Sequence, residues 1–403
     1  MKTIVIGGGA AGCFAAVWAA RQGQQVCLIE KNDRIGKKLR ITGKGRCNVT
    51  NNCDRDTLLA NIPRGGRFLY SAFAAWSPQD TMAFFEELGV PLKTERGNRV
   101  FPVSDQAAEI VETLRSELVR LHVEIVRGRA DRLLTDAQGR CTGVHAGQHN
   151  YHADRVILAV GGATYPGTGS EGDGYVMARI AGHTVTDISP SLVPLETLER
   201  DCAEMMGVSL KNVTLTLKRD GKTVWQELGE MLFTHFGVSG PLVLSASAHL
   251  EKGGTYTIHI DLKPALTEEQ LDKRILREIG DAPNKELPSM LRRLLPASMV
   301  MPMLGRCGLP ARMKCNSLTK PQRQRIIREL KDFAFTVRGT RPMEEGIVTR
   351  GGVSLKEINP KTMESRIMPG LYFAGEILDC DAYTGGFNLQ IAWSTAYLAG
   401  TAF

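Results

Sequence analysis

The first thirty residues constrain the fold more than any other stretch of the chain. Lys2 to Ile6 is a short β-rich run, a G-x-G-x-x-G pattern follows, residues 10–20 have a helical composition, and residues 26–29 form a second strand-like run that ends in Glu30. Together they predict one βαβ unit whose helix N-terminus faces a phosphate. Glu30 stands where a carboxylate accepts a hydrogen bond from an adenosine ribose hydroxyl. The chain is therefore expected to open with a dinucleotide-binding domain.

The three glycines of this pattern have separate tasks. Gly7 permits a tight turn after the strand, Gly9 lets the backbone approach a pyrophosphate, and Gly12 lets the helix pack closely on the strand. A glycine-rich turn in an ordinary α/β domain is the alternative. A strand, a helix, a second strand and a terminal acid in register favour dinucleotide binding.

The composition is that of a soluble globular protein, with 43% hydrophobic and 23% charged residues. At 403 residues the chain is long enough for roughly two to three domains. No stretch is long enough to cross a membrane, and removal of the N-terminus as a signal peptide would destroy the βαβ unit. We therefore expect a complete, cytoplasmic protein without a membrane partner.

Nine cysteines are scattered along the chain without a C-x-x-C pair, which predicts reduced thiols rather than disulfides or a zinc site. His145, His149 and His152 form one histidine cluster. They fall around a turn between two predicted strands, so solvated turn residues are favoured over metal ligands. No metal is expected.

The formal net charge of +7 is concentrated in one segment. Residues 288–340 hold eleven Lys and Arg against Glu329 and Asp332. Such a positive field attracts polyanions, most commonly nucleic acid, although solvated basic helix faces that bind nothing are also frequent. The eleven cations are Arg292, Arg293, Arg306, Arg312, Lys314, Lys320, Arg323, Arg325, Arg328, Lys331 and Arg338.

A second glycine-rich loop, Thr42 to Asn48, follows the βαβ unit. It is similar to a nucleoside-triphosphatase loop, but Gly36 lies too far upstream and Gly45 stands where a Ser or Thr would hold magnesium. We interpret it as a loop that folds over the same dinucleotide. Its cations suit a pyrophosphate or an anionic flavin ring.

The next hundred residues continue the α/β pattern. Helices are predicted over residues 77–88 and 104–121, and strands over residues 123–126, 130–135, 143–145 and 151–160. The last strand runs into Gly161 and Gly162, at the carboxyl edge where an open α/β sheet meets its ligand.

From about residue 189 to residue 340 the pattern changes to that of an inserted domain. Strands are predicted over residues 213–218, 224–227 and 256–262, and helices over residues 267–279, 286–294 and 320–333. Residues 232–241 are predicted to be a loop around His235, and they lack the G-x-S-x-G of a hydrolase.

The chain closes on a strand, a loop and a helix. Residues 370–376 form a predicted strand that ends in Gly375 and Glu376, and Gly385-Gly386 opens a helix that runs to Gly400. The N-terminus of that helix can direct its amides and positive dipole at a reduced flavin.

These motifs together resemble the bacterial BaiN/RdsA-like flavoproteins, also labelled NAD(P)/FAD-dependent oxidoreductase or aminoacetone-oxidase-like. The resemblance covers essentially the whole chain. It rests on the glycine fingerprint with Glu30, the Thr42–Asn48 loop, Phe233-Thr234-His235 with Ser239-Gly240-Pro241, Thr349-Arg350-Gly351-Gly352-Val353, Phe373-Ala374-Gly375-Glu376, and Gly385-Gly386-Phe387-Asn388.

The resemblance implies an α/β fold: a glutathione-reductase-type FAD-binding Rossmann domain with an inserted β-barrel-like domain and a helical subdomain. The expected boundaries are residues 1–190 and 341–403 for the FAD domain, 191–262 and about 330–340 for the inserted β domain, and 263–329 for the basic helical subdomain.

FAD is the expected bound cofactor, with NAD(P)H as a transient electron donor because only one glycine fingerprint follows a strand. The candidate cofactor-binding residues are Gly7, Gly9, Ala11, Gly12, Glu30, Lys31, Lys38, Thr42, Gly43, Arg46, Cys47, Asn48, Gly161, Gly162, Gly375, Glu376, Gly386, Asn388 and Leu389.

Three functions are compatible with these features. The first is reduction of a uridine in large-subunit ribosomal RNA to dihydrouridine, with the RNA held by residues 288–340. The second is a small-molecule oxidase or enone reductase, and the third is a non-catalytic flavin-binding protein. Reduction of uracil requires a general acid, for which Cys47 and His235 are the candidates. Lys44 and Arg46 are expected to lower the pKa of the Cys47 thiol, while a packing role for Cys47 and a loop role for His235 are the alternatives.

Overall fold

The computed structural model describes residues 1–402 and consists of two compact units. Unit 1 contains Met1–Ser191 and the C-terminal part from Pro342 onward, and unit 2 contains Leu192–Arg341. Each unit has an apolar core of its own. No helix among residues 1–402 is both long and apolar enough to cross a bilayer.

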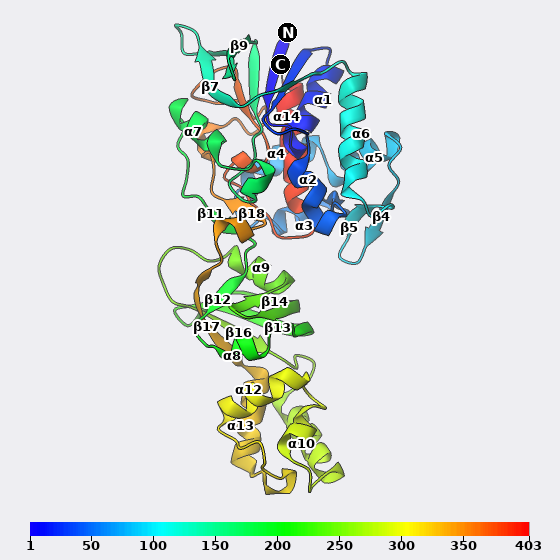
Figure 1. The fold of residues 1–403 in the computed structure, drawn as a ribbon, viewed down its shortest axis with the longest axis vertical. Helices are drawn as coiled ribbons and strands as arrows, with labels where there is room; N and C mark the ends of the chain where they lie inside the picture. The colour runs from blue at the N-terminus through cyan, green and yellow to red at the C-terminus, as the bar shows by residue number, and fades with distance from the viewer. Residues whose placement is uncertain (403) are drawn as a thin grey trace. The chain divides into compact units, whose positions relative to one another are not determined.

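Unit 1 is built on a five-stranded parallel sheet (Figure 1). Its strand order is β19-β10-β1-β2-β6, so segments from both ends of the chain lie next to each other. Helix α1 and the C-terminal helix α14 pack against one another beside this sheet. The bounds are β1 Lys2–Ile6, α1 Ala10–Arg21, β2 Gln25–Glu30, β6 Glu124–Arg127, β10 Arg155–Leu158, β19 Leu371–Phe373 and α14 Phe387–Thr401.

Two small antiparallel sheets, β3-β5-β4 and β7-β8-β9, and a two-stranded pair, β11-β18, complete the strands of unit 1. These strands are β3 Thr50–Asn51, β4 Leu92–Glu95, β5 Arg99–Pro102, β7 Ala130–Thr135, β8 Cys141–Ala146, β9 His149–His152, β11 Ser189–Ser191 and β18 Val348–Arg350. The remaining helices and short 3₁₀ turns are α2 Lys37–Ile41, η1 Thr42–Gly45, α3 Arg55–Ala60, α4 Gly66–Ala75, α5 Pro78–Glu87, α6 Ala107–Arg120, η2 Pro166–Thr168, α7 Asp173–Ile180, η4 Met343–Glu345, η5 Leu355–Glu357 and η6 Gly375–Ile377.

The single strand predicted over residues 151–160 is two strands. β9 pairs antiparallel with β8, whereas β10 enters the parallel sheet beside β1. The change occurs at Asp154, whose amide donates to the Lys2 carbonyl and whose carboxylate accepts from the Lys2 amide at 2.7 Å. This contact fixes where the chain leaves the hairpin and joins the parallel sheet.

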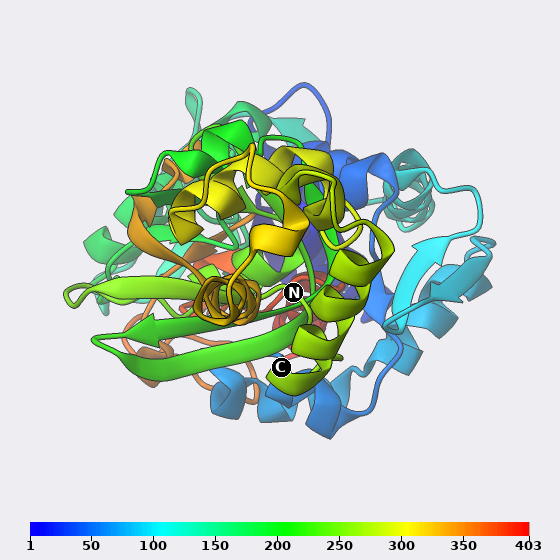
Figure 2. The ribbon, with the colours of Figure 1, turned by 90° about the horizontal axis from the view of Figure 1, so that it is seen from below.

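Unit 2 contains a closed six-stranded barrel of order β12-β15-β14-β13-β16-β17. In Figure 2 the green and yellow-green strands of the barrel lie side by side, with β13 between β14 and β16. Alternate residues such as Leu215 and Leu217 are fully buried, as the period-2 pattern requires. The strands are β12 Leu195–Thr197, β13 Ser209–Arg219, β14 Lys222–Thr234, β15 Gly237–Ser239, β16 Tyr256–Asp261 and β17 Phe333–Thr340.

The predicted loop over residues 232–241 is largely strand. β14 continues to Thr234, and β15 pairs with it after a turn at His235 and Phe236. Gly237 permits this tight return, because a Cβ atom at that position would lie 2.3 Å from the Leu195 carbonyl oxygen. The Gly and Pro residues thus mark a hairpin rather than an extended loop.

The helices of unit 2 follow local signals in part. Capping boxes at Thr267 and Thr319 start α10 and α13 as predicted, whereas α11 is shorter than the predicted helix over 286–294. Helix α12 was not predicted, because Pro302 lies inside it. The bounds are α8 Asp201–Glu204, α9 Pro241–Ser247, α10 Glu268–Asp281, α11 Leu287–Leu291, α12 Ala297–Cys307, η3 Cys315–Ser317 and α13 Lys320–Lys331. The predicted α/β class with a barrel-like insertion is confirmed, while the separate boundaries of a helical subdomain stay a prediction.

Candidate functional site

The glycine fingerprint forms a tight strand-to-helix turn at the carboxyl end of β1. Gly7 has φ +100°, and a Cβ atom there would lie 2.6 Å from the Ala159 carbonyl oxygen. A Cβ atom at Gly12 would lie 1.7 Å from the Gly7 carbonyl oxygen. A Cβ atom at Gly9, in contrast, would have no neighbour within 4 Å and would face open space.

Helix α1 therefore starts with its amides available. Gly9 is its N-cap residue and supplies no side-chain hydrogen bond, and the first turn contains no acidic residue. The positive end of the helix dipole and the unpaired N–H groups of a helix N-terminus favour an anion. This geometry fits a pyrophosphate in front of Ala10 and Ala11.

Glu30 is held rigidly at the end of β2. Its carboxylate accepts from the Gly8 amide at 2.6 Å and from the backbone and side-chain nitrogens of Asn32 at 2.7 Å each. An ionised carboxylate has about four lone-pair sites, so it can accept further hydrogen bonds from a ribose. Lys31, the next predicted residue, instead forms ion pairs with Asp173 at 2.8 Å and Glu171 at 3.3 Å.

The loop after β10 contacts Asn32, the neighbour of Glu30, at one end and Thr349 of β18 at the other. At one end the Asn32 side chain donates to the Thr168 carbonyl at 3.1 Å. At the other end a Cβ atom at Gly162 would lie 2.1 Å from the Thr349 hydroxyl, so only glycine fits. The glycine pair therefore lets this loop pass close to β18.

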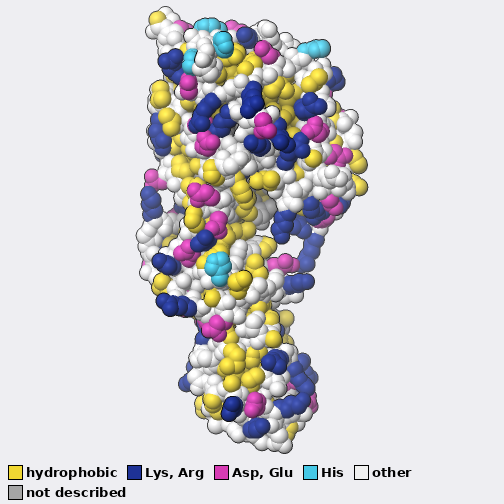
Figure 3. All heavy atoms as spheres, in the orientation of Figure 1, with side chains coloured by type: hydrophobic (Ala, Val, Ile, Leu, Met, Phe, Trp, Pro, Cys, Tyr) yellow, Lys and Arg dark blue, Asp and Glu magenta, His cyan; other side chains and the backbone are white. Residues whose placement is uncertain are grey.

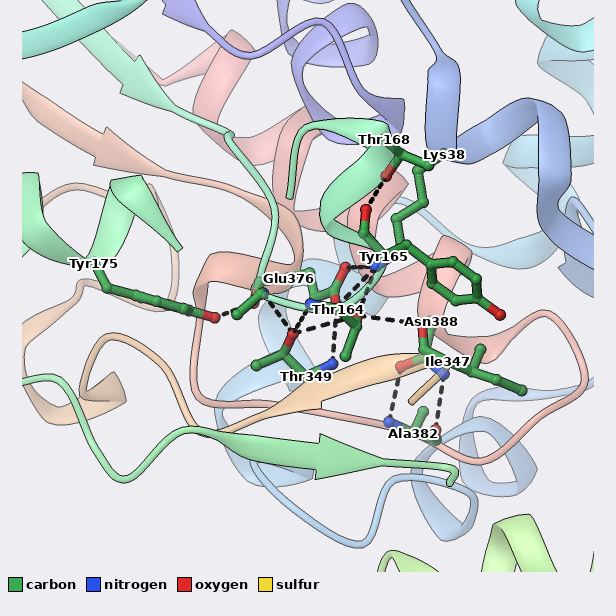
Figure 4. Close-up of polar contacts among 11 residues, drawn as sticks. Lys38, Thr164, Tyr165, Thr168, Tyr175, Ile347, Thr349, Glu376, Ala382 and Asn388 are labelled. Atoms are coloured by element: carbon green, nitrogen blue, oxygen red, sulfur yellow. Dashed lines mark hydrogen bonds and ion pairs between the residues drawn. The ribbon is translucent and has the colours of Figure 1, made fainter. Parts of the chain in front are cut away.

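Lys38, Thr164, Thr349 and Glu376 form a polar cluster at this point (Figure 4). The Lys38 ammonium lies 2.8 Å from the Glu376 carboxylate and 2.9 Å from the Thr164 hydroxyl. The Thr349 amide donates to the same carboxylate at 2.8 Å. The cluster thus connects α2, the loop after β10, β18 and η6.

Opposing effects act on the pKa of Glu376. Burial raises it, but the Lys38 ammonium and the Thr349 amide outweigh burial and hold it below its ordinary value. The side chains of Glu376 and Lys38 are each 21% exposed, so both reach the surface of the site. Glu376 is therefore an anionic acceptor at neutral pH.

The loop before α14 is held by Asn388, a residue in the first turn of this helix. The Asn388 amide group accepts from the Ala382 amide at 2.9 Å and donates to the Ala382 carbonyl at 2.7 Å (Figure 4). Gly386, with φ +99°, is the N-cap residue and leaves the first amides of α14 uncapped, including that of Leu389. A Cβ atom at Gly375 would lie 2.7 Å from the Ala11 Cβ, which brings the starts of α1 and η6 together.

The loop from Thr42 to Asn48 is unusually rich in left-handed backbone. Gly43, Lys44, Gly45 and Cys47 all have positive φ angles between 58° and 85°. Such conformations cost about 1–3 kcal/mol for a residue other than glycine and tend to cluster at functional sites. The loop is joined to α14 through the Trp393 indole, which donates to the Val49 carbonyl at 2.9 Å.

Two side chains of this loop differ in their availability. Arg46 is ion-paired with Glu95 at 2.5 Å and Asp105 at 2.6 Å and stacks on Phe101, so its charge is already neutralised. The Asn48 side-chain oxygen is buried and has no hydrogen-bond partner among residues 1–402. An orphaned buried acceptor of this kind fits an N–H group of a bound cofactor.

Cys47 does not have the electrostatic surroundings that the sequence suggested. The side chain is fully buried, and burial raises the pKa of the thiol to about 12, with a small opposing effect from Thr42. The expectation that Lys44 and Arg46 lower this pKa is therefore wrong, because Arg46 faces its acids and burial dominates. His235, the other candidate, lies exposed at the β14–β15 turn of unit 2.

Unit 1 thus contains, around one site, the fingerprint, Glu30, the glycine pair, Lys38, Glu376 and the start of α14. Lys31 and Arg46 were also predicted to bind the cofactor, but both form ion pairs with acidic residues instead. Thr164 and Thr349 were not predicted as site residues. The signal was present, since Thr164 follows the glycine pair by two residues and Thr349 opens the Thr-Arg-Gly-Gly-Val motif.

The histidine cluster divides between two strands. His145 lies on β8 and contacts Asp131 at 2.8 Å, while His149 and His152 lie on β9. Among residues 1–402, no group of three His, Cys, Asp or Glu side chains is placed to hold a metal ion. All nine cysteines are buried and unpaired.

Comparison with known proteins also identifies a Rossmann-type domain. The family model described as the HI0933-like protein Rossmann domain matches residues 1–402. The chain belongs to this HI0933-like family. With that membership it is an oxidoreductase of the FAD-dependent class.

Curated relatives of the HI0933-like chain carry two different names. The 3-dehydro-bile acid delta(4,6)-reductase of Clostridium scindens is 35% identical over 99% of this chain and 98% of its own. The ribosomal RNA dihydrouridine synthases of Haemophilus influenzae and Escherichia coli are 32% and 30% identical, each over 98% of this chain and 96% of their own. The overall relationship therefore does not select a substrate.

A solved structure with the same fold is the 3-ketosteroid delta1-dehydrogenase of Sterolibacterium denitrificans. It has a TM-score of 0.53 at 14% identity and covers 99% of this chain and 98% of its own. Sdh1 of Mycobacterium smegmatis has a TM-score of 0.51 at 17% identity, over 99% of this chain and 67% of its own. At these identities the likeness concerns the fold alone.

Proposed function

We propose that the protein is an FAD-dependent reductase that converts a uridine of large-subunit ribosomal RNA to dihydrouridine. Reduction of uracil adds a hydride at C6 and a proton at C5 of a double bond conjugated with a carbonyl. The hydride reaches the enzyme from NAD(P)H. The proton must come from a side chain or from water at the site.

The residues of unit 1 fit FAD. The uncapped N-terminus of α1 would hold the pyrophosphate, and Glu30 would accept from the adenosine ribose. The Asn48 oxygen and the uncapped amides of α14 would face the flavin ring, and Glu376 would accept from a hydroxyl of the chain between ring and phosphate. When bound and reduced, the flavin supplies the hydride.

Two residues, Cys47 and His235, are candidates for the proton donor. A Cys47 thiol with its pKa near 12 retains its proton throughout the physiological range and can deliver it only to a strongly basic carbanion or enolate. His235 is exposed at the turn between β14 and β15. We favour Cys47, because it lies within the predicted flavin-binding loop of unit 1, but its fully buried side chain must become accessible before it can reach a substrate. His235 is the alternative.

The observation that favours RNA is a set of exposed cations in unit 2 that form no salt bridge within residues 1–402. Of the eleven basic residues between 288 and 340, six are exposed and form no ion pair or side-chain hydrogen bond within residues 1–402: Arg292, Arg312, Lys314, Lys320, Arg328 and Arg338. Figure 3 shows further Lys and Arg side chains on the face of unit 2 that carries α10. Exposed Lys and Arg side chains of this kind bind the phosphates of a nucleic acid backbone. Reduction of a small molecule does not require them.

The other cations of this segment have structural partners. Arg293, Arg306, Arg323 and Lys331 pair with Glu278, Asp201, Asp272 and Asp261, and Arg325 donates to the Cys307 carbonyl at 2.9 Å. Arg323 is only 9% exposed. These residues stabilise the packing of unit 2, so the proposed RNA contact through residues 288–340 is limited to the six exposed cations that form no ion pair or side-chain hydrogen bond within residues 1–402.

The decisive test is deletion of the gene in its host and measurement of dihydrouridine in ribosomal RNA by mass spectrometry. We expect one dihydrouridine to be lost and to return with the intact gene, but not with a Gly9→Leu variant. Unchanged RNA would contradict the proposal.

A small-molecule enone reductase is the second candidate, and the 35% identity to a bile acid reductase favours it. It is distinguished by the acceptor that reoxidises the reduced protein. Rapid reoxidation by 3-oxo-Δ4-steroids together with no change in the RNA would support this candidate.

A further inference from the structure

A second cationic surface lies on unit 1, outside the basic segment. The Arg55 guanidinium carbon lies 4.4 Å from the ring centroid of Tyr70, which joins the start of α3 to the exposed face of α4. Tyr70 is 49% exposed. Arg67 is exposed and stands one helical turn before Tyr70, so both side chains share one face of α4.

The charge of this surface is positive. Residues 55–75 contain three arginines against a single acid, Asp56. Neither Arg55 nor Arg67 has an ion-pair partner among residues 1–402, and Asp54 uses its carboxylate to cap α3 through the Thr57 amide at 2.8 Å. The two guanidinium groups are therefore available to an anion.

The contact between Arg55 and Tyr70 is not needed to hold α3 and α4 together. Leu58 on α3 and Leu69 and Phe73 on α4 are almost completely buried in the core of unit 1. An exposed cation–π contact of this kind adds only about 0.5–1 kcal/mol. Its position on the surface calls for another explanation.

The segment between α3 and α4 contacts the loop that precedes α14. Arg64, between α3 and α4, forms a backbone bridge with Asp381, and the Tyr383 amide donates to the Asn61 carbonyl at 3.0 Å. Asp381 and Tyr383 belong to the loop that Asn388 fixes at the start of α14. In Figure 1, α4 lies beside the red helix α14, and these two helices pack against one another, while α3 packs on α4.

We infer that the Arg55–Tyr70–Arg67 surface binds a single strand of RNA, with a base stacked on the Tyr70–Arg55 pair and a phosphate on Arg67. Single-stranded RNA is recognised by aromatic side chains and guanidinium planes that stack on unpaired bases, next to cations that bind the backbone. The inference rests on the proposed function, because it names where the RNA strand lies beside the cofactor-bearing site.

The test uses the full-length FAD-loaded protein and a twelve-nucleotide oligouridylate as the probe, with affinity measured by fluorescence anisotropy. Tyr70→Leu should weaken binding about five-fold or more, because stacking is lost, whereas Tyr70→Phe should keep it. Arg67→Gln should reduce the slope of log affinity against log salt concentration by about one, as expected for the loss of one phosphate contact. Arg179→Gln, an exposed arginine on α7 of the same unit, is the matched control and should change neither quantity.

Photo-crosslinking of 4-thiouridine in the same probe gives an independent measurement. We expect the crosslinked nucleotide on the tryptic peptide that begins at Phe68 and contains Tyr70, and its loss in Tyr70→Leu. Equal affinity of Tyr70→Leu and wild type, with crosslinks elsewhere, would overturn the inference while leaving the proposed function intact. A wild-type protein that binds no RNA and whose deletion leaves dihydrouridine unchanged would instead overturn the proposed function and this inference together.

Discussion

At the scale of single residues, the Lys38–Glu376 pair is the contact that unites the candidate site. It joins α2 to η6 at 2.8 Å and also orders Thr164. We expect Lys38→Met to lower stability by about 1–3 kcal/mol, because it leaves a partly buried carboxylate without its cation. Thermal unfolding measures the loss. Lys37→Met is the control, since its ion pair with Asp33 is more exposed.

The same pair gives stability a defined pH dependence. The pKa of Glu376 is lower in the folded protein than the ordinary value of about 4.3 for an unfolded chain. Its contribution to stability is thus present above about pH 4.3 and is lost as the pH falls through the folded pKa. The stability difference between wild type and Lys38→Met should shrink in acid, and a constant difference from pH 7 to pH 3 would contradict this account.

Cys47 is expected to act as a protonated thiol rather than as a thiolate. Because burial raises its pKa to about 12, iodoacetamide at pH 8 should not label Cys47 in the folded protein. Cys47→Ala should retain FAD and still be reduced by NAD(P)H, but should fail to turn over an acceptor. Stopped-flow absorbance separates these two half-reactions. Normal turnover would return Cys47 to a packing role and direct attention to His235.

Gly9 offers a clean way to remove the cofactor. Its φ is −80° and no atom lies within 4 Å of a Cβ position, so a side chain is tolerated by the fold but projects in front of the α1 amides. Gly9→Leu should keep its circular dichroism spectrum and lose its visible flavin absorbance. Gly280→Leu, at another glycine with open surroundings, should keep both. Full FAD content in Gly9→Leu would refute the phosphate site.

At the scale of elements, α10 and α13 show that a basic residue can serve the fold or a ligand. Arg323 joins the two helices through Asp272 at 2.5 Å, whereas Arg312 and Lys314 are exposed without a side-chain partner among residues 1–402. We expect Arg312→Glu with Lys314→Glu to weaken RNA binding without changing the melting temperature or the FAD content. Arg323→Leu should lower the melting temperature instead. Electrophoretic mobility shifts at two salt concentrations, with melting curves, separate the two effects.

The elements also show what the sequence could predict. The βαβ unit, α5, α10 and α13 were predictable because capping residues and periodic apolar positions are local signals. The division of residues 151–160 into β9 and β10 was not, because it depends on Asp154 meeting Lys2, which lies far away in sequence. For the same reason Lys38 and Glu376 could be named as candidates from the sequence, but the contact of Lys38 with Thr164 and that of Glu376 with Thr349 emerged only from the fold.

At the scale of the whole molecule, the chain leaves unit 1 after Ser191 and re-enters it at Pro342. The residues of the first core all belong to unit 1, and those of the second core all belong to unit 2. All candidate cofactor residues lie in unit 1, while the six exposed cations of the basic segment that lack a side-chain partner within residues 1–402 lie in unit 2. Cofactor binding and the proposed RNA binding by residues 288–340 therefore have separate structural supports.

This division predicts that unit 1 folds without unit 2. If Ser191 is joined to Pro342 by a flexible Gly/Ser linker, β11 and β18 can still pair in their native antiparallel register, Ser189 opposite Arg350. We expect the shortened protein to unfold cooperatively and to bind FAD, because the five-stranded sheet, α1, α14 and their common core are all retained. It should also lose the part of RNA affinity that the basic segment supplies, yet keep the crosslink to Tyr70. Calorimetry measures the unfolding, flavin absorbance the FAD content and fluorescence anisotropy the RNA affinity. A shortened protein that is unfolded or free of flavin would show that the cofactor site depends on unit 2.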